Sequence, residues 1–295
     1  MTHLTTSQSP FSITWKFRAG RLLLYLTVLL LAAMFGFPLF WTVATSLKTP
    51  PEIFHFPPQT LPEVPQWGNY LEIFTRPRTP FVGWTLNSMK IVLLTATGTV
   101  ITASMVGYSL ARFKYRGRDL LFLITLATLM LPGEVTLIPQ FVLFHKLHWI
   151  DTHNPLWVPY WFGGGAFGIF LMRQFFLTLP RDLDEAALID GAGYFRIFWS
   201  VLLPLSRPAL ATLAIITLMV SWSDFLGPLI YLNSPGKFTL SVGIQFFNNY
   251  PEIGGEPTQH LLMVACILAL ILPTTIFFLG QRYFVQGIAT SGIKG

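Results

Sequence analysis

Long apolar runs dominate the pattern of hydrophobic and polar positions. Three of them, Leu22–Trp41, Ile91–Ala111 and Leu261–Gln281, contain no charged residue. Each has about the 20 residues that a helix needs to cross a bilayer. Asn154–Met172 is slightly shorter and also uncharged. The pattern therefore predicts four continuous membrane-spanning helices.

Two further apolar runs are each interrupted by one acid. Leu120–Phe144 contains Glu134, and Ala209–Leu232 contains Asp224. Proline and glycine lie next to both acids. A charge at mid-bilayer costs about 2.5–3.5 kcal/mol, so such residues usually face the protein interior or a cavity. We expect two broken spanning helices here, which makes six spans in all.

The composition agrees with a polytopic membrane protein. Of the 295 residues, 53% are apolar and 11% are charged, whereas soluble domains carry about 25% charged residues. This balance excludes a disordered chain, a disulfide scaffold and an ordinary cytosolic enzyme. The single cysteine, Cys266, lies in an apolar run and is interpreted as a packing residue.

The basic residues are distributed unevenly between the two sides. One side carries 13 of the 19 Lys and Arg residues, and they are Lys16, Arg18, Arg21, Arg112, Lys114, Arg116, Arg118, Arg173, Arg181, Arg196, Arg207, Arg282 and Lys294. The other side carries five, which are Lys48, Arg76, Arg78, Lys146 and Lys237. Cytoplasmic loops collect Lys and Arg, so both termini are predicted to be cytoplasmic. The net charge of +6 is thus explained by membrane topology, and no nucleic-acid partner is expected.

Two loops on the outer side are long. Lys48–Trp84 is rich in proline and aromatic residues, and we expect it to be ordered and non-helical. Asn233–His260 contains the segment Phe238–Val242, whose pattern is typical of a strand. Glycines in the fourth span, Gly163–Gly165 and Gly168, favour close helix packing.

The loop 180–208 has the most specific pattern. Pro180 is expected to end the fourth helix, and Asp182 with Glu185 resembles a capping box that starts a short helix. Ala186 and Ala187 give this helix a face of small residues, and Gly191 permits a tight turn after it. Such a helix can dock into a groove of another protein. The alternative is a helix lying on lipid, but its acidic start argues against that.

This loop resembles the EAA loop of ABC importer permeases. In that family, Glu-Ala-Ala is followed by a glycine and, after nine residues, by an aliphatic residue and Leu-Pro; here Glu185-Ala186-Ala187, Gly191, Val201 and Leu203-Pro204 have the same spacing. The chain from about Phe81 to Gly295 is similar to the shorter permease subunit of the maltose-type branch. The resemblance implies an all-α, type I importer transmembrane domain in a bacterial cytoplasmic membrane.

The resemblance also implies roles for residues and partners. The coupling helix that docks on an ATPase subunit would contain Glu185, Ala186, Ala187, Asp190 and Gly191. Two ATPase subunits, a second and different permease and an extracytoplasmic solute-binding protein would complete the complex. The sequence has no G-x-x-x-x-G-K-[ST] motif, so we expect ATP and Mg²⁺ in the partner subunits and no cofactor on this chain.

The intramembrane acids indicate a translocation path for a sugar, polyol or glycoside. The candidate residues are Glu134, Ser221, Ser223 and Asp224. In the alternative interpretation each acid caps a broken helix or bonds Ser221, Ser223 or Gln140, and the partner permease holds the main substrate contacts. A second group is expected either to face the binding protein or to lie in an interfacial aromatic belt, and comprises Gln245, Phe246, Phe247, Asn248, Asn249 and Tyr250.

Other functions remain as alternatives. Glu134 and Asp224 could serve as paired carboxylates of a membrane-embedded enzyme acting on a glycosidic or lipid substrate. A secondary carrier would show an internal repeat, which we do not find. A cluster on an outer loop could bind a metal, although a partner-facing loop is favoured; its members are His145, His148, Asp151 and His153.

The predicted organisation has four parts. They are an N-terminal cytoplasmic tail (1–21), the first span with the proline-rich outer loop (22–82), the permease core (83–284) that includes the loop 180–208, and a C-terminal cytoplasmic tail (285–295).

Overall fold

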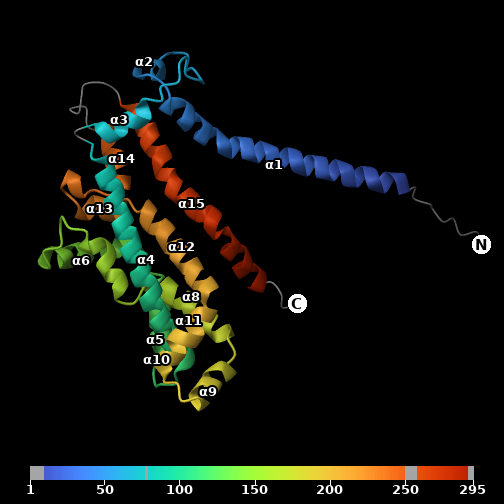
Figure 1. Cartoon of the computed structure of the whole chain (residues 1–295), viewed down its shortest axis with the longest axis vertical. Helices are drawn as coiled ribbons and strands as arrows, with labels where there is room; N and C mark the ends of the chain where they lie inside the picture. Colours follow the sequence, from blue (N-terminus) through green and yellow to red (C-terminus); the bar gives the residue numbers. More distant parts are fainter. Residues whose placement is uncertain (1–9, 77–78, 250–257, 292–295) are drawn as a thin grey trace, which may run out of the picture. The chain divides into compact units, whose positions relative to one another are not determined.

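The computed structural model describes residues 10–76, 79–249 and 258–291, and within these ranges all regular structure is helical (Figure 1). The chain divides into two compact units. The first comprises Met1–Glu72 and Glu256–Ile267, and the second comprises Ile73–Gly255 and Leu268–Gly295. This confirms the predicted all-α class.

Three helices are long and apolar enough to cross a membrane. These are the stretch Gly20–Ser46 of α1 (Pro10–Ser46), α4 (Phe81–Arg112), and Gln259–Gln281 of α15 (Gln259–Ser291). Three bent pairs of helices also pass the same test, which gives up to six spans. Three of the six apolar runs therefore form continuous helices, and the other three overlap the bent pairs, two of which also include helices of the loop 180–208.

The proline-rich outer loop is partly helical in its described residues, so the non-helical prediction is wrong. It contains α2 (Pro50–Ile53) and α3 (Asn69–Thr75). In the first unit, the Asn69 side chain donates to the carbonyl oxygens of Ser46 (2.8 Å) and Lys48 (3.1 Å). These bonds satisfy the last carbonyl group of α1 and one just after it, which explains why the loop folds back onto the helix end.

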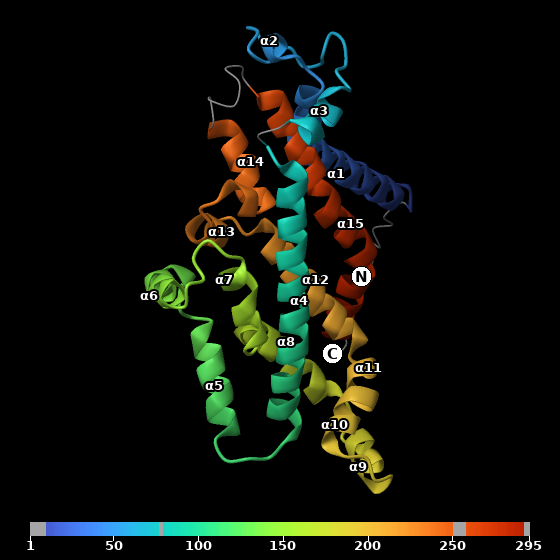
Figure 2. The same cartoon turned by 60° about the vertical axis from the view of Figure 1, so that its left-hand side comes forward.

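The core of the second unit lies around α4. This helix runs the length of the unit beside α8 (Gly165–Thr178) and α12 (Arg207–Ser223) (Figure 2). Met172, Phe176 and Leu213 are almost fully buried in one cluster with α4 residues. Large side chains from α8 and α12 thus fill the space that the small residues of α4 leave open.

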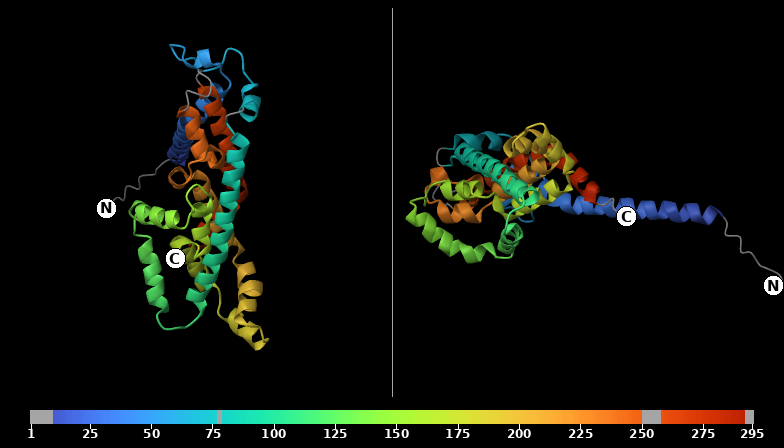
Figure 3. Two further views of the ribbon diagram at one scale, coloured as in Figure 1. Left: turned by 90° about the vertical axis from the view of Figure 1, so that its left-hand side faces the viewer. Right: turned by 90° about the horizontal axis from the view of Figure 1, so that it is seen from below.

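Both spans that contain an acid are broken beside it. The axes of α5 (Arg118–Thr128) and α6 (Gly133–Lys146) differ by 98°, and Glu134 lies in the first turn of α6 (Figure 3). Asp224 lies between α12 and α13 (Leu226–Tyr231). The predicted interruptions are confirmed.

The sequence predicts a continuous fourth span, but in the structure this span is interrupted. It consists of α7 (Asn154–Trp157), a 3₁₀ turn η1 (Val158–Trp161) and α8. Gly164 separates the last two and adopts a left-handed φ of +67°. There, a Cβ atom would lie 2.6 Å from the Thr99 carbonyl oxygen, so close packing explains this glycine.

The remaining helices lie within the loops that the sequence predicts between the spans. The loop 180–208 folds as α9 (Asp182–Ile189), α10 (Tyr194–Ile197), a π-turn η2 (Phe198–Leu202) and α11 (Leu203–Leu205). The 3₁₀ turn η3 (Pro235–Lys237) and α14 (Leu240–Asn249) follow α13.

The expected strand at Phe238–Val242 is wrong, because α14 begins inside it. Phe238, Leu240 and Val242 are all buried, and a short apolar run of this kind cannot be assigned by periodicity alone. The Ser88 hydroxyl of α4 accepts a hydrogen bond from the Leu240 amide at 2.8 Å. The two residues are 152 positions apart along the chain, so a tertiary contact helps to start this helix.

Candidate functional site

The short helix α9 begins at Asp182, with Arg181 as its N-cap residue. The amides of Asp184 and Glu185 donate to the Arg181 carbonyl group, and no side chain caps this end. The predicted capping box is therefore wrong, because Asp182 is already inside the helix. Its acids still stabilise the helix, since three of them lie in the first turn near the positive end of the helix dipole.

Gly191 ends α9 in a Schellman motif. Its φ is +80°, its amide donates to the Leu188 carbonyl group at 3.0 Å, and the Ala192 amide donates to the Ala187 carbonyl group at 2.9 Å. This is the 5→2 and 6→1 pattern that needs a left-handed residue after the helix. The predicted turn at Gly191 is confirmed. An added Cβ would meet no atom of this chain within 4 Å, so the space beside Gly191 is open.

An ion pair holds α9 to the end of α4. Arg112 Nη1 lies 3.3 Å from Asp184 Oδ2, and Arg112 Nη2 donates to the Leu179 carbonyl group. The Arg112 side chain is 5% exposed. Burial raises the pKa of Asp184 above its ordinary value, although Arg112 and Arg181 act in the opposite direction. The pair thus connects the loop mechanically to a membrane-spanning helix.

Aromatic contacts add to this connection. The Tyr108 hydroxyl of α4 donates to the Tyr194 carbonyl group at 3.3 Å, and the rings of Phe113 and Tyr194 meet edge to face with centroids 5.2 Å apart. Phe198 packs on Tyr108 with centroids 5.1 Å apart. The segment after α9 is therefore fixed against the same helix end.

The exposed surface of the loop 180–208 carries large apolar side chains. Ile189 is 86% exposed and Phe195 72%, and the ring of Trp199 stacks on Phe195. Leu188 is also exposed. We refer to Leu188, Ile189, Phe195 and Trp199 as the apolar docking patch. A rigidly held patch of this type, flanked by polar residues, is typical of a protein interaction site.

The predicted coupling residues have different environments on α9. Glu185, Ala186, Asp190 and Gly191 are exposed, whereas Ala187 is half-buried and packs against the core below the loop. Four of the five are therefore accessible to a partner.

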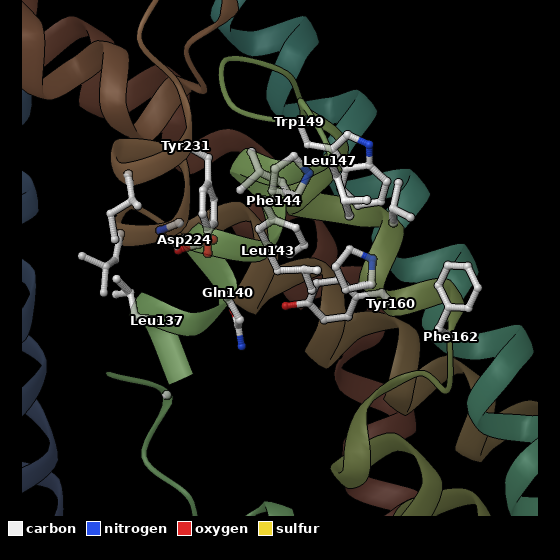
Figure 4. A pocket seen from close by; sticks show the side chains of 18 of the residues that line it. Leu137, Gln140, Leu143, Phe144, Leu147, Trp149, Tyr160, Phe162, Asp224 and Tyr231 are labelled. Atoms are coloured by element: carbon white, nitrogen blue, oxygen red, sulfur yellow. Dashed lines mark hydrogen bonds between the residues drawn. The ribbon is translucent and has the colours of Figure 1, made fainter. Parts of the chain in front are cut away.

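A cavity of about 670 Å³ lies between α6, the α7–η1 segment and α13 (Figure 4). Glu134, Gln140 and Asp224 line it, together with aromatic groups that include Tyr160 and Tyr231. The two acids that the sequence singled out are thus brought to one cavity, from spans that are 90 residues apart. Its size and its mixture of aromatic and polar groups suit an organic solute.

A second cavity of about 570 Å³ adjoins the first. Ser221, Ser223 and Asp224 line it, and Asp224 and Tyr160 line both cavities. All four predicted path residues therefore lie along two adjoining hollows in the second unit.

Asp224 also has a local structural role. Its Oδ1 accepts a hydrogen bond from the Gly227 amide at 3.2 Å, and its carbonyl oxygen accepts one from the Ser241 hydroxyl at 2.6 Å. The acid therefore caps the start of α13, as one alternative predicted. For Glu134 the structure describes no such bond, and Gln140 donates to Thr136 instead (3.1 Å).

Asp151 joins two outer loops, which the sequence did not indicate. Its carboxylate accepts bonds from the amides of Asn233 (3.0 Å) and Ser234 (2.9 Å), from the Ser234 hydroxyl (2.6 Å) and from Lys237 Nζ (2.8 Å). These partners, above all Lys237, hold the pKa of Asp151 well below its ordinary range. His153 contacts the Lys237 carbonyl group at 2.9 Å.

The histidines near Asp151 do not form a metal site. No group of three or more His, Cys, Asp or Glu side chains with suitable geometry occurs in the part of the chain that the structure describes. The predicted metal alternative is not supported there, because Asp151 is already saturated by donors from the following loop.

The binding-protein-facing residues are only partly described. Gln245 is exposed on α14, and for Phe246, Phe247, Asn248 and Asn249 the structure describes only the helical backbone. Tyr250 lies outside the described residues. The described part of this predicted group thus lies on a helix, α14.

Sequence reasoning missed two pairs that organise these sites. Arg112 and Asp184 lie 72 positions apart, and Asp151 and Lys237 lie 86 positions apart. A charged residue next to an apolar run was the available signal in each case. It does not reveal the partner, because the partner is fixed only by the tertiary fold.

Comparisons with known proteins agree with this arrangement. Residues 100–290 match the family described as "Binding-protein-dependent transport system inner membrane component". The arabinooligosaccharides transport system permease protein AraQ of Bacillus subtilis is 33% identical over 287 residues, covering 95% of this chain and 98% of AraQ. The sn-glycerol-3-phosphate transport system permease protein UgpE of Yersinia pestis is 34% identical, covering 86% and 91%.

A solved structure shows the same fold. It is a bacterial ABC transporter involved in the import of the acidic polysaccharide alginate, with a TM-score of 0.78 at 20% identity over 95% of this chain and all of the other. The family match covers well over half of the chain and includes α9, the docking patch and the larger cavity. The chain belongs to the family of inner membrane components of binding-protein-dependent transport systems.

Proposed function

We propose that this chain is a permease subunit of an ATP-driven importer that carries a sugar or a related polyol or glycoside across the cytoplasmic membrane of a bacterium. The family match and the two named permeases support the transport role. The sugar class rests on the name of AraQ and on the aromatic lining of the larger cavity. Aromatic faces suit the apolar faces of sugar rings, and carboxylates and amides accept and donate to hydroxyl groups.

The observation that carries the proposal is the geometry of α9. Glu185 and Ala186 of the helix and Gly191 just after it are exposed, and the apolar docking patch begins in the last turn of the helix. The Arg112–Asp184 pair would transmit a movement of this surface directly to α4. A partner that pulled on α9 would therefore move the helix that supports the core of the permease.

We assign the docking partner as an ATPase subunit that holds ATP and Mg²⁺. The sequence itself has no phosphate-binding loop of the required pattern. The complete importer would contain two ATPase subunits, a second permease and an extracytoplasmic binding protein. Both termini and α9 would then face the cytoplasm, in agreement with the distribution of basic residues.

The cavities that share Asp224 form our proposed translocation path. Glu134, Ser221, Ser223 and Asp224 would offer polar contacts to solute hydroxyl groups. The enzyme alternative loses its support, because the matched family and the named relatives are transport components.

Three variants of Gly191 test the docking proposal. Gly191→Asp adds a charged side chain, Gly191→Asn adds one of similar size that tolerates a left-handed φ, and Gly191→Ala adds only strain of about 1 kcal/mol. Because the space beside Gly191 is open within this chain, the added groups would project toward the partner.

We expect Gly191→Asp and Gly191→Asn to weaken co-purification of the ATPase subunit and to reduce uptake at least tenfold, whereas Gly191→Ala retains most of both. Glu185→Ala should have a smaller effect, through one lost ion pair with the partner. Solute binding by the extracytoplasmic protein should be unchanged in all of them. Normal uptake by Gly191→Asp, with the ATPase subunit still bound, would show that α9 is not the coupling element.

A further inference from the structure

A basic pocket of about 540 Å³ lies at the cytoplasmic end of α5. Its lining side chains come from the turn between α4 and α5, from the start of α5 and from the N-cap of α9, and they are Lys114, Tyr115, Arg116, Arg118, Asp119 and Arg181. Four of these six residues are cationic and only one is acidic. The pocket is distinct from the cavities of the proposed path, with which it shares no lining residue.

The single acid of this basic pocket is already engaged. Asp119 Oδ1 lies 2.9 Å from Arg118 Nη2, and Arg173 lies 3.9 Å from the same oxygen. Lys114, Arg116 and Arg181 are exposed, and none of the three forms an ion pair in the part of the chain that the structure describes. Lys114 and Arg116 thus lie at the hollow without ionic partners, while Arg181 also acts on the charge of Asp184, and this excess of positive charge favours an anionic ligand.

The same pocket opens beside an apolar helix face. Leu120, Leu121 and Leu123 of α5 are each more than half exposed, and they follow the pocket directly along the helix. The opposite face of α5 carries Phe122, whose ring stacks on Phe170 of α8 and lies under Arg173. One side of α5 is therefore packed on the protein, and the other is apolar and exposed, with the cations at its N-terminal end.

We propose that the basic pocket binds the phosphate headgroup of an anionic phospholipid from the cytoplasmic leaflet, with the acyl chains lying along α5. The orientation rests on the proposed topology of the importer. Because Arg181 is also the N-cap residue of α9, the bound headgroup would join the membrane surface to the helix that docks the ATPase subunit. The lipid would then restrain the position of α9.

The test compares two matched pairs of substitutions in the assembled complex. Lys114→Gln with Arg116→Gln removes two cations from the pocket, and Arg196→Gln with Arg207→Gln removes two exposed cations from the same side but outside it. Binding of phosphatidylglycerol and phosphatidylcholine to each complex would be titrated by native mass spectrometry. Arg181→Gln, measured alone, tests the link to α9.

The pocket pair should lower the affinity for phosphatidylglycerol on the order of 30-fold, while the control pair leaves it within about twofold. Phosphatidylcholine should bind equally to all complexes, and millimolar inorganic phosphate should not displace phosphatidylglycerol. Arg181→Gln should reduce both the lipid affinity and the stimulation of ATP hydrolysis by anionic lipid.

Other results would overturn the lipid site. Equal losses in both pairs would indicate a diffuse surface charge, and displacement by inorganic phosphate would indicate a soluble anion as the ligand. Unchanged lipid binding with loss of the ATPase subunit would identify the pocket as a protein contact. The proposed transport function is judged separately. It is measured as uptake and ATPase association of the complex with the control pair, and neither measurement depends on the lipid result.

Discussion

At the scale of single residues, Asp151 illustrates how one carboxylate can organise two loops. Asp151 lies in the loop between α6 and α7. Four of the groups that donate hydrogen bonds to it, however, lie in the segment 233–237, after α13. Its backbone amide also donates to the Tyr231 carbonyl group at 2.7 Å, and its φ is +58°, in the left-handed region. Tyr231 lines the larger cavity, so this network supports one wall of the proposed path.

Replacing Asp151 with Asn should loosen this network. The carboxylate lies against Lys237, and hydrogen bonds to charged groups contribute about 1.5–3 kcal/mol each. The frequency of local opening should therefore rise by about tenfold or more. Hydrogen exchange of the peptide segment 230–238 measures this opening. Ser234→Ala, which removes one hydroxyl bond and keeps the ion pair, should show a smaller effect.

The same network should depend on pH in a defined direction. Because the folded-state pKa of Asp151 is lowered, its contribution to stability is fully present above the ordinary carboxyl pKa of about 4 and declines as the pH falls below it. The difference in exchange between the wild type and Asp151→Asn should therefore be largest near pH 7 and shrink in acid. A difference that grew on acidification would contradict the assignment.

At the scale of helices, the contact between α4 and α8 depends on Gly164. Gly164 and Gly165 both have positive φ angles, of +67° and +74°, but only the former meets α4. An alanine Cβ would lie 2.6 Å from the Thr99 carbonyl oxygen at Gly164 and would meet nothing within 4 Å at Gly165. The two positions therefore separate backbone strain from loss of packing.

Gly164→Ala should destabilise the chain by about 2–4 kcal/mol, because strain and overpacking add, and Gly165→Ala by about 1–2 kcal/mol from strain alone. Thermal unfolding in detergent compares the two variants with the wild type. Equal losses of stability would mean that α4 and α8 do not approach each other as closely as the structure indicates.

The helices also show how far sequence patterns can predict this fold. Hydrophobic run length located the spans, and proline and glycine near Glu134 and Asp224 located the breaks, because both signals are local. The strand expected at Phe238–Val242 failed because burial of all three apolar side chains hides the helical period. The bend of 98° at Glu134 and the shared cavity depend on tertiary packing, which no window of the sequence contains.

At the scale of the whole molecule, the distribution of basic residues predicts the orientation of every loop. The strongest clusters are in the 112–118 turn and around α9, and both lie at the same end of the second unit (Figure 2). The loop that contains Asp151 and the 233–237 segment carry only Lys146 and Lys237. Since Lys and Arg collect on the cytoplasmic side, the end with α9 should face the cytoplasm and the Asp151 network should face outward.

Single cysteines on a Cys266→Ala background test this orientation. Gly236→Cys lies on the outer segment, where an added Cβ meets nothing within 4 Å, and should react with an impermeant thiol reagent while the cytoplasmic membrane is intact. Ser291→Cys, at the end of α15, should react only after the cytoplasmic membrane is opened.

A third cysteine tests the number of spans. With six spans, both chain ends lie on the cytoplasmic side, so a cysteine introduced at Ser7 should behave like the one at Ser291. Labelling of Ser291→Cys from outside, with Gly236→Cys protected, would invert the topology and remove α9 from the reach of a cytoplasmic ATPase. If the cysteines at Ser7 and Ser291 labelled from opposite sides, the number of spans would be odd, and at least one of the bent helix pairs would then have to re-enter the membrane without crossing it.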